Sequence, residues 1–176
     1  SFPLLINARS ETAAEKAAFR NAMRHRRAIV PASGFYEWRR EGGSRPQPYW
    51  VRPKRGGIIA FGALMETYAE SGGSEIDTGA ILTTAASADI AHIHDRMPVV
   101  IQPEDFSRWL DCRTQEPREV AELMRPAQPD FFDKDSMRYA KQWQETMGGK
   151  HYNTLNDEGR PAFVEGVTGF PYADHC

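Results

Sequence analysis

Short apolar runs of β-strand composition alternate with turn-forming residues from residue 28 to residue 101, and this pattern most constrains the fold. The runs cover residues 28–30, 31–38, 48–52, 58–64, 79–84 and 99–101. Glycine-rich turns at 41–44 and 54–57 and a polar loop at 69–77 separate several of them. Many short strands with few helices between them predict a curved, mostly antiparallel, barrel-like β-sheet.

Three segments are expected to be helical and to flank this sheet. Thr12 followed by Glu15 fits a capping box, for a helix that runs to about Arg24. A second helix begins at Pro103 with acidic residues in its first turn, and a third covers 116–124. Residues 126–176 carry scattered proline, aspartate and glycine and are expected to be irregular. The sequence therefore predicts a single α+β domain over residues 1–176.

Composition excludes several classes of protein. The 176 residues are 40% hydrophobic and 26% charged, which is typical of one soluble globular domain. No run of about 18 apolar residues is present, so we expect no membrane-spanning segment. The two cysteines make no disulfide framework and favour a reducing cytoplasmic location. We expect a monomer.

The net charge of −2 hides an asymmetry between the two parts of the chain. Residues 1–60 contain 12 Lys and Arg against 4 Asp and Glu, whereas residues 61–176 contain 10 against 20. A basic N-terminal part indicates an anionic partner such as nucleic acid. Random variation in solvated charge gives the same pattern, so both interpretations stay open.

The segment 31–38 places a carboxylate, Glu37, between aromatic residues. Strand alternation puts Phe35 and Glu37 on one face and Tyr36 and Trp38 on the other. Burial of an unpaired carboxylate is costly and favours its protonated form, so Glu37 could hold and release a proton near neutral pH. The alternative is a salt bridge with Arg39 or another arginine at a sheet edge.

His94, followed by Asp95 and Arg96, is the second candidate for chemistry. A histidine beside an acid and an arginine can donate a proton or hold a phosphate, but it can equally be a structural histidine at the start of a strand. His92 and His94 would share a strand face, yet no third metal ligand is evident, so we predict no metal. No phosphate-binding loop or other cofactor motif is present, so we predict no cofactor.

Four aromatic residues are interleaved with arginines in and beyond this segment. Aromatic platforms beside a basic groove are a common way to hold single-stranded nucleic acid, although aromatic residues in strands more often belong to the core. The residues are Tyr36, Trp38, Tyr49 and Trp50, with Arg39, Arg40, Arg45 and Arg52. Trp38 is our candidate for a stacking contact.

Four motifs in order resemble the SOS-response-associated peptidase (SRAP) family of abasic-site shielding proteins. They are residues 7–12 (Asn-Ala-Arg-Ser-Glu-Thr), 34–38 (Gly-Phe-Tyr-Glu-Trp), 83–86 (Thr-Thr-Ala-Ala) and 94–98 (His-Asp-Arg-Met-Pro). The resemblance covers residues 2 to about 110. It implies an enzyme that removes its own leading residues and exposes an N-terminal cysteine. That cysteine then forms a thiazolidine crosslink with abasic sites in single-stranded DNA.

The resemblance also implies roles for individual residues. Asn7 would position the amine or the opened sugar. Glu37 would shuttle protons during imine formation and assist the self-cleavage, while His94 would help ring opening and hold a phosphate. DNA contacts would come from Arg9, Thr84, Trp38 and Arg96. The protein would be cytoplasmic and associate with the nucleoid through DNA.

Two departures from the family pattern leave alternatives open. Neither Cys112 nor Cys176 stands where the family has its nucleophile, so we expect the chain to be N-terminally truncated and unable to crosslink as given. Residues 151–157 resemble the family only loosely, and 159–176 match nothing known to us. The alternatives are a non-covalent single-stranded DNA-binding module and a hydrolase that uses Glu37 and His94.

Overall fold

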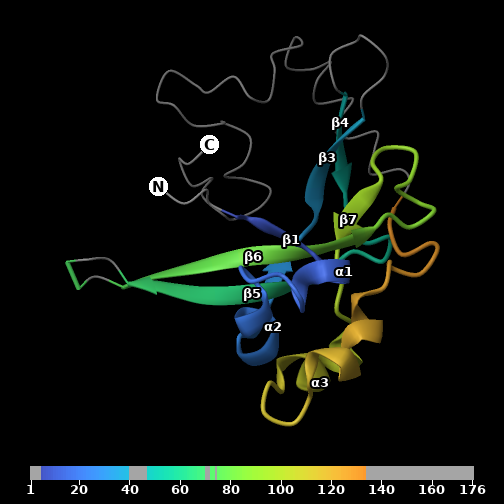
Figure 1. Ribbon diagram of the computed structural model, residues 1–176. Coiled ribbons are helices and arrows are strands. Elements are labelled where there is room, and N and C mark those ends of the chain that lie inside the picture. The colour runs from blue at the N-terminus through green and yellow to red at the C-terminus, as the bar shows by residue number, and fades with distance from the viewer. Residues whose placement is uncertain (1–4, 40–46, 70–71, 74, 134–176) are drawn as a thin grey trace.

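The computed structural model describes residues 5–39, 47–69, 72–73 and 75–133. In this part of the chain, one five-stranded sheet carries the fold, with strand order β1-β6-β5-β2 and β7 paired to β6 (Figure 1). Its strands are β1 (Asn7–Arg9), β2 (Arg27–Ala32), β5 (Ile59–Ala69), β6 (Glu75–Ala85) and β7 (Arg96–Pro98). A separate antiparallel pair consists of β3 (Phe35–Arg39) and β4 (Gln47–Val51).

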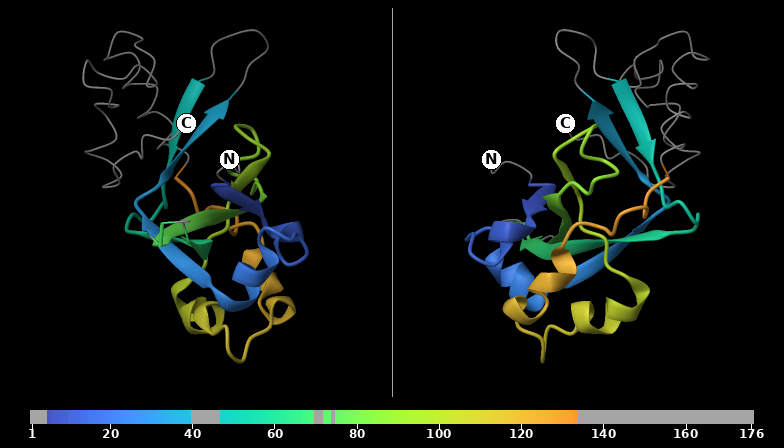
Figure 2. Two further views of the ribbon diagram at one scale, coloured as in Figure 1. Left: turned by 60° about the vertical axis from the view of Figure 1, so that its left-hand side comes forward. Right: turned by 90° about the vertical axis from the view of Figure 1, so that its right-hand side faces the viewer.

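The α+β class and the mostly antiparallel sheet are confirmed. Only the β1–β6 pairing is parallel, and the described strands form an open sheet that does not close into a barrel. The β3–β4 ribbon rises from one side of this sheet, whereas α2 and α3 lie on the opposite side in all three views (Figures 1 and 2). The long β5–β6 hairpin projects away from the body (Figure 1).

Two apolar clusters follow from the burial pattern of the central strands. Residues 59–64 of β5 are buried without alternation, because both faces of this part of the strand are covered. Met23, Leu64 and Trp109 belong to the cluster between the sheet and the helices. Val51 and Phe61 belong to the second cluster, which lies under the β3–β4 ribbon and anchors it to the sheet.

The predicted helix 12–24 is broken into α1 (Ser10–Ala13) and α2 (Arg20–His25). The expected capping box is wrong: Arg9 is the N-cap, and the Thr12 hydroxyl is buried without a hydrogen-bond partner. Ala13 and Met23 are both fully buried in one cluster. A continuous helix would separate them by about 15 Å along its axis, so the break lets both side chains reach the core.

Other expected boundaries differ in instructive ways. The polar loop is shorter than predicted, because β5 extends to Ala69 and β6 begins at Glu75, with Thr67 Oγ1 donating to Asp77 Oδ1 at 2.7 Å. The strand predicted at 99–101 is instead β7, three residues earlier, followed by an isolated bridge between Phe61 and Val100.

The two predicted C-terminal helices have different outcomes. The helix at Pro103 is confirmed as a 3₁₀ turn, η1 (Pro103–Asp105), that leads into α3 (Phe106–Leu110). The predicted helix 116–124 is two 3₁₀ turns, η2 (Pro117–Glu119) and η3 (Ala121–Met124). The predicted turn at 41–44 and most of 126–176 lie outside the described residues.

Candidate active site

Glu37 stands in β3, where aromatic packing fixes its neighbours. Phe35 packs edge-to-face on Phe61 in the core, with ring centroids 5.9 Å apart, while Tyr36 packs on Trp50 at 4.8 Å. The predicted alternation of faces is therefore confirmed. The Glu37 side chain is 21% exposed, and its Oε1 accepts a hydrogen bond from the Trp38 backbone N–H at 3.1 Å.

Gly34 makes this arrangement possible. A Cβ at this position would lie 2.4 Å from the Val51 carbonyl oxygen and 2.6 Å from the Trp50 ring. Only glycine allows the chain between β2 and β3 to approach β4 so closely. The turn at Gly34 therefore sets where β3 begins. It also sets the position of Glu37, which follows three residues after Gly34.

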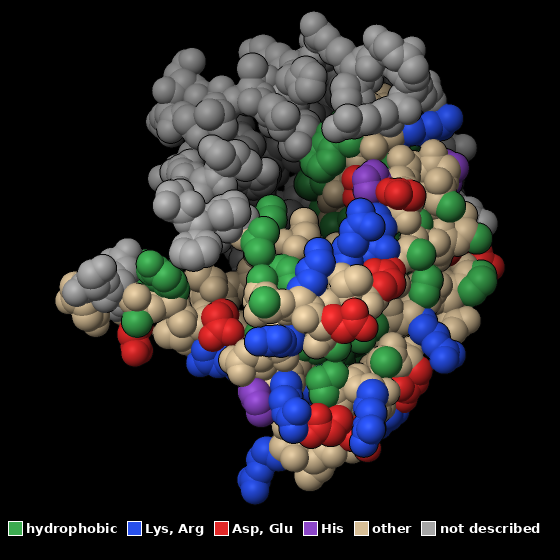
Figure 3. Space-filling view, in the orientation of Figure 1, with side chains coloured by type: hydrophobic (Ala, Val, Ile, Leu, Met, Phe, Trp, Pro, Cys, Tyr) green, Lys and Arg blue, Asp and Glu red, His purple; other side chains and the backbone are tan. Residues whose placement is uncertain are grey.

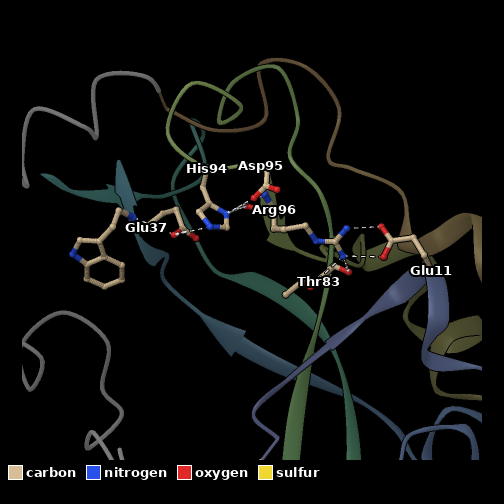
Figure 4. A network of polar contacts seen from close by, with 7 residues as sticks. Glu11, Glu37, Thr83, His94, Asp95 and Arg96 are labelled. Atoms are coloured by element: carbon tan, nitrogen blue, oxygen red, sulfur yellow. Dashed lines mark hydrogen bonds and ion pairs between the residues drawn. The ribbon is translucent and has the colours of Figure 1, made fainter. Parts of the chain in front are cut away.

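His94 faces Glu37 from the loop between β6 and β7 (Figure 4). His94 Nε2 lies 4.0 Å from Glu37 Oε1. On the other side of the ring, Nδ1 accepts the Arg96 backbone N–H at 3.0 Å. Because a neutral imidazole has one donor and one acceptor nitrogen, we infer that neutral His94 carries its proton on Nε2, toward Glu37.

Protonated His94 also finds partners in this arrangement. Its Nδ1 lies 3.3 Å from the Asp95 carboxylate and 3.3 Å from the Arg96 carbonyl oxygen, and either oxygen can accept a hydrogen bond from the Nδ1–H of the charged ring. Two carboxylates, Glu37 and Asp95, then flank the imidazolium. The pair Glu37–His94 can thus hold a proton on either partner, as general acid–base chemistry requires.

Arg96 is held by a neighbouring network rather than left open to solvent. Its Nη1 and Nη2 donate to the two carboxylate oxygens of Glu11 at 2.7 and 2.9 Å, and Nη2 also donates to the Thr83 carbonyl oxygen at 2.6 Å (Figure 4). The Arg96 side chain is 18% exposed. Its hydrogen bonds hold the pKa of Glu11 below the usual range, so the pair is charged at neutral pH.

The other predicted site residues, Asn7 of the catalytic set and the DNA contacts Arg9, Thr84 and Trp38, lie at different depths. Asn7 and Arg9 are exposed at alternate positions of β1, and Arg9 pairs in register with Thr83. Arg9 and Arg96 therefore approach Thr83 from the two strands that flank β6, β1 and β7. Thr84 is only 4% exposed, and Trp38 is half-buried beside Tyr36.

Charge on the visible face is mixed. Figure 3 shows Lys and Arg side chains interspersed with Asp and Glu rather than gathered in one basic patch. Arg24 pairs with Glu116, and Arg26 pairs with Glu66. These ion pairs reduce the positive charge that the N-terminal part of the sequence offers to an anionic partner.

No metal site is evident in the part of the chain that the structure describes. It contains no group of three or more His, Cys, Asp or Glu side chains that could hold a metal ion. His92 lies in a turn rather than in a strand with His94, so the predicted shared strand face is wrong. The described helices are all too short or too polar to cross a membrane.

Comparison with known proteins now adds to this geometry. Residues 2–140 match the family model described as SOS response associated peptidase (SRAP). The chain belongs to the SRAP family. The match extends about thirty residues beyond the resemblance seen in the sequence motifs.

Two curated relatives are both named abasic site processing proteins. "Abasic site processing protein YoqW" of Bacillus subtilis is 35% identical over 133 residues, which are 76% of this chain and 57% of the relative. "Abasic site processing protein YedK" of Escherichia coli is 40% identical over 108 residues, 61% of this chain and 48% of the relative. The chain thus spans about half the length of the curated relatives it matches.

Solved structures show the same fold. A Bacteroides thetaiotaomicron protein superposes with a TM-score of 0.68 at 30% identity, covering 72% of this chain and 56% of that protein. A Bordetella bronchiseptica protein gives a TM-score of 0.64 at 27% identity, covering 72% of this chain and 62% of that protein. The SRAP fold therefore accounts for most of the described residues.

Sequence reasoning missed Glu11 and Thr83 as members of the site. Both stood inside SRAP motifs, but no spacing rule pairs residue 11 with residue 96. The expected aromatic platform also changes, since Trp50 is 6% exposed and belongs to the interior. Arg52 pairs with Asp133. Arg40 and Arg45 lie outside the described residues.

Proposed function

We propose that this chain forms the core of a protein that captures abasic sites in single-stranded DNA covalently. SRAP membership and the abasic-site names of its relatives support this proposal. The observation that carries it is the Glu37–His94 pair, with Oε1 and Nε2 4.0 Å apart. Condensation between an amine and an aldehyde needs groups that donate and accept protons, and a carboxyl group and an imidazole can each do so.

The nucleophile in this scheme is the N-terminal cysteine that the resemblance implies, exposed by self-cleavage that Glu37 assists. His94 promotes opening of the abasic sugar to its aldehyde. The cysteine amine adds to the aldehyde carbon, and loss of one water gives an imine. The thiol sulfur then adds to the imine carbon, and its proton passes to the nitrogen, closing a thiazolidine ring. Glu37 accepts and returns the protons moved in these steps.

The remaining predicted residues bind and orient the DNA in this proposal. Arg9, exposed on β1, contacts the phosphate backbone, and Arg96 stands on the other side of Thr83. Asn7 orients the amine or the opened sugar, Thr84 lines the pocket from beneath, and Trp38 stacks on a base. The protein works as a cytoplasmic monomer that joins the nucleoid through DNA.

Incubation of the full-length protein with a single-stranded oligonucleotide that carries one abasic site tests the proposal. We expect a product that survives a denaturing gel and whose crosslink maps to an N-terminal cysteine. A matched oligonucleotide with a reduced abasic site, which has no aldehyde, should give no such product. Retention of both oligonucleotides only under native conditions would instead identify a non-covalent binding module.

A peptide substrate separates the third possibility. A hydrolase that uses Glu37 and His94 would cleave peptides in trans and form no covalent DNA product. Turnover of a peptide library without any crosslink would contradict the proposed function. The coding sequence upstream of Ser1 offers a simple companion observation, because the covalent scheme expects a cysteine directly after the initiator methionine.

A further inference from the structure

Glu11 has no role in the chemistry above, yet it makes the best-formed ion pair near the site. We propose that Glu11 is a positioning residue: by gripping Arg96, it fixes the His94 imidazole with Nε2 toward Glu37. This inference deepens the proposed function and rests on it for its catalytic meaning. Its structural content, the orientation of one histidine ring, can be tested without DNA.

The grip on Arg96 uses both terminal nitrogens of the guanidinium group, whereas its Nε is buried without a hydrogen-bond partner. Glu11 accepts two parallel hydrogen bonds at 2.7 and 2.9 Å, and Thr83 accepts two more from Nη2, at 2.6 Å on its carbonyl oxygen and 3.2 Å on its hydroxyl. Bidentate arginine–carboxylate pairs set orientation as well as energy. The network thereby joins three elements, α1 through Glu11, β6 through Thr83 and β7 through Arg96.

The main chain of Arg96 transmits this constraint to His94. Its backbone N–H donates to His94 Nδ1 at 3.0 Å, only two residues back along the chain. β7 has three residues, and Arg96 is its first, paired with Ala85 at the end of β6. So short a strand holds its first residue with few ladder hydrogen bonds, and the side-chain grip supplies the missing restraint.

Figure 4 shows the resulting line of contacts from Glu11 through Arg96 and His94 to Glu37. Loss of the carboxylate at residue 11 leaves the guanidinium with its contacts to Thr83 alone and loosens the start of β7. The His94 ring then loses its fixed donor at Nδ1, and either nitrogen can carry the proton. The tautomer of His94 with its proton on Nε2, facing Glu37, is then no longer the only one present.

Nitrogen NMR of the histidine rings directly measures which nitrogen of His94 carries the proton. The spectra are recorded at about pH 8.5, where imidazoles are ordinarily neutral. His94→Gln assigns the His94 signals among the five histidines. We expect wild type to show the Nε2–H tautomer, Glu11→Gln to show a mixture, and Glu11→Asp to restore part of the wild-type signal. Glu122→Gln is the matched control, because Glu122 also pairs with an arginine, Arg108, at 2.7 Å, and it should leave the His94 signals unchanged.

Crosslinking kinetics of the full-length protein provide the second readout. Glu11→Gln should slow crosslinking at saturating DNA by about tenfold to a hundredfold, since a small misplacement of a catalytic group has effects of this size. DNA affinity should not fall, because the substitution removes a negative charge. A merely structural role of Glu11 would lower the crosslinking rate and the DNA affinity together, or would change neither of them.

The outcomes separate this inference from the proposed function. His94 signals that are identical in Glu11→Gln and wild type would overturn the positioning role, whatever the crosslinking result. A wild-type protein that forms no crosslink would overturn the proposed function, whatever the NMR result. If Glu11→Gln does not fold, Arg96→Lys, which keeps the charge but loses the fork, must produce the same tautomer mixture for the inference to stand.

Discussion

Among the arginines that the structure describes, Arg27 is the one whose loss should cost the most stability. It is 5% exposed, and its guanidinium donates to four backbone carbonyl oxygens: Trp109 at 2.7 Å and Met23, Asp111 and Gln115 at 2.9 Å each. The guanidinium also lies 5.6 Å from the centre of the Trp109 ring. Arg27 therefore joins the start of β2 to α2, to α3 and to the loop after α3.

Arg27→Ala removes this cation and leaves the carbonyls without their donor. Hydrogen bonds to a charged group and an interrupted buried network together predict a loss of about 3–5 kcal/mol in the free energy of unfolding. Arg26→Ala is the matched control, because Arg26 makes one ion pair with Glu66 at 3.3 Å and is 42% exposed. Such a pair contributes about 0.2–1 kcal/mol.

Equilibrium unfolding in urea, followed by tryptophan fluorescence, measures both variants on one scale. We expect a large fall in the midpoint for Arg27→Ala and little change for Arg26→Ala, with similar slopes. Equal losses for the two variants would refute the inference that the four carbonyl contacts stabilise the junction of β2 with the helices. Weaker DNA binding by Arg27→Ala under folding conditions would further contradict a purely structural role.

Three further predictions follow from the described contacts. Gly34→Ala should lower the unfolding free energy by about 1–3 kcal/mol, because the added methyl meets a backbone oxygen of Val51, whereas Gly72→Ala, with open space around it, should change urea unfolding little. Because Arg96 lowers the pKa of Glu11, the stability due to this pair is present above about pH 4.3, the ordinary glutamate value, and is lost as the pH falls further. Glu11→Gln should therefore flatten the pH dependence of the thermal midpoint in that range. An unchanged pH dependence would contradict the charged pair. Arg9→Ala should weaken binding to single-stranded DNA and reduce the slope of log affinity against log salt by about 0.7; an unaltered slope would show that Arg9 does not touch phosphate.

Much of the sheet could be predicted, because strand signals depend on local alternation and turns. The two faces of β3 and its antiparallel pairing with β4 follow from residues within the segment 31–52. The expected run 31–38 is instead divided between the end of β2 at Ala32 and the start of β3 at Phe35. The break between α1 and α2 could not be predicted, since it depends on burying Ala13 and Met23 in one cluster with Trp109. That requirement comes from distant parts of the chain.

In the candidate site, too, features set by the local sequence could be predicted and features set by distant contacts could not. Glu37 and His94 carried chemical signals of their own, and the structure brings them to 4.0 Å. Arg24, Arg26 and Arg27 are close neighbours in the sequence, yet Arg27 is buried while Arg24 and Arg26 are exposed in ion pairs. Burial and partner choice depend on tertiary contacts, which residue spacing does not encode.

The central claim is that Glu37 accepts and donates protons during a reaction that takes place on the side of Glu37 that faces His94. Glu37→Gln removes the acid–base function while keeping nearly the same shape, and Oε1 can still accept the Trp38 N–H. Glu66→Gln, an exposed carboxylate paired with Arg26, is the control for charge.

The decisive measurement is the single-turnover rate constant for crosslinking of full-length protein to an abasic oligonucleotide, taken beside the DNA affinity. We predict that Glu37→Gln lowers the rate constant by about a hundredfold or more and leaves the affinity nearly unchanged, while Glu66→Gln matches wild type. A Glu37→Gln protein that crosslinks at the wild-type rate would contradict the account.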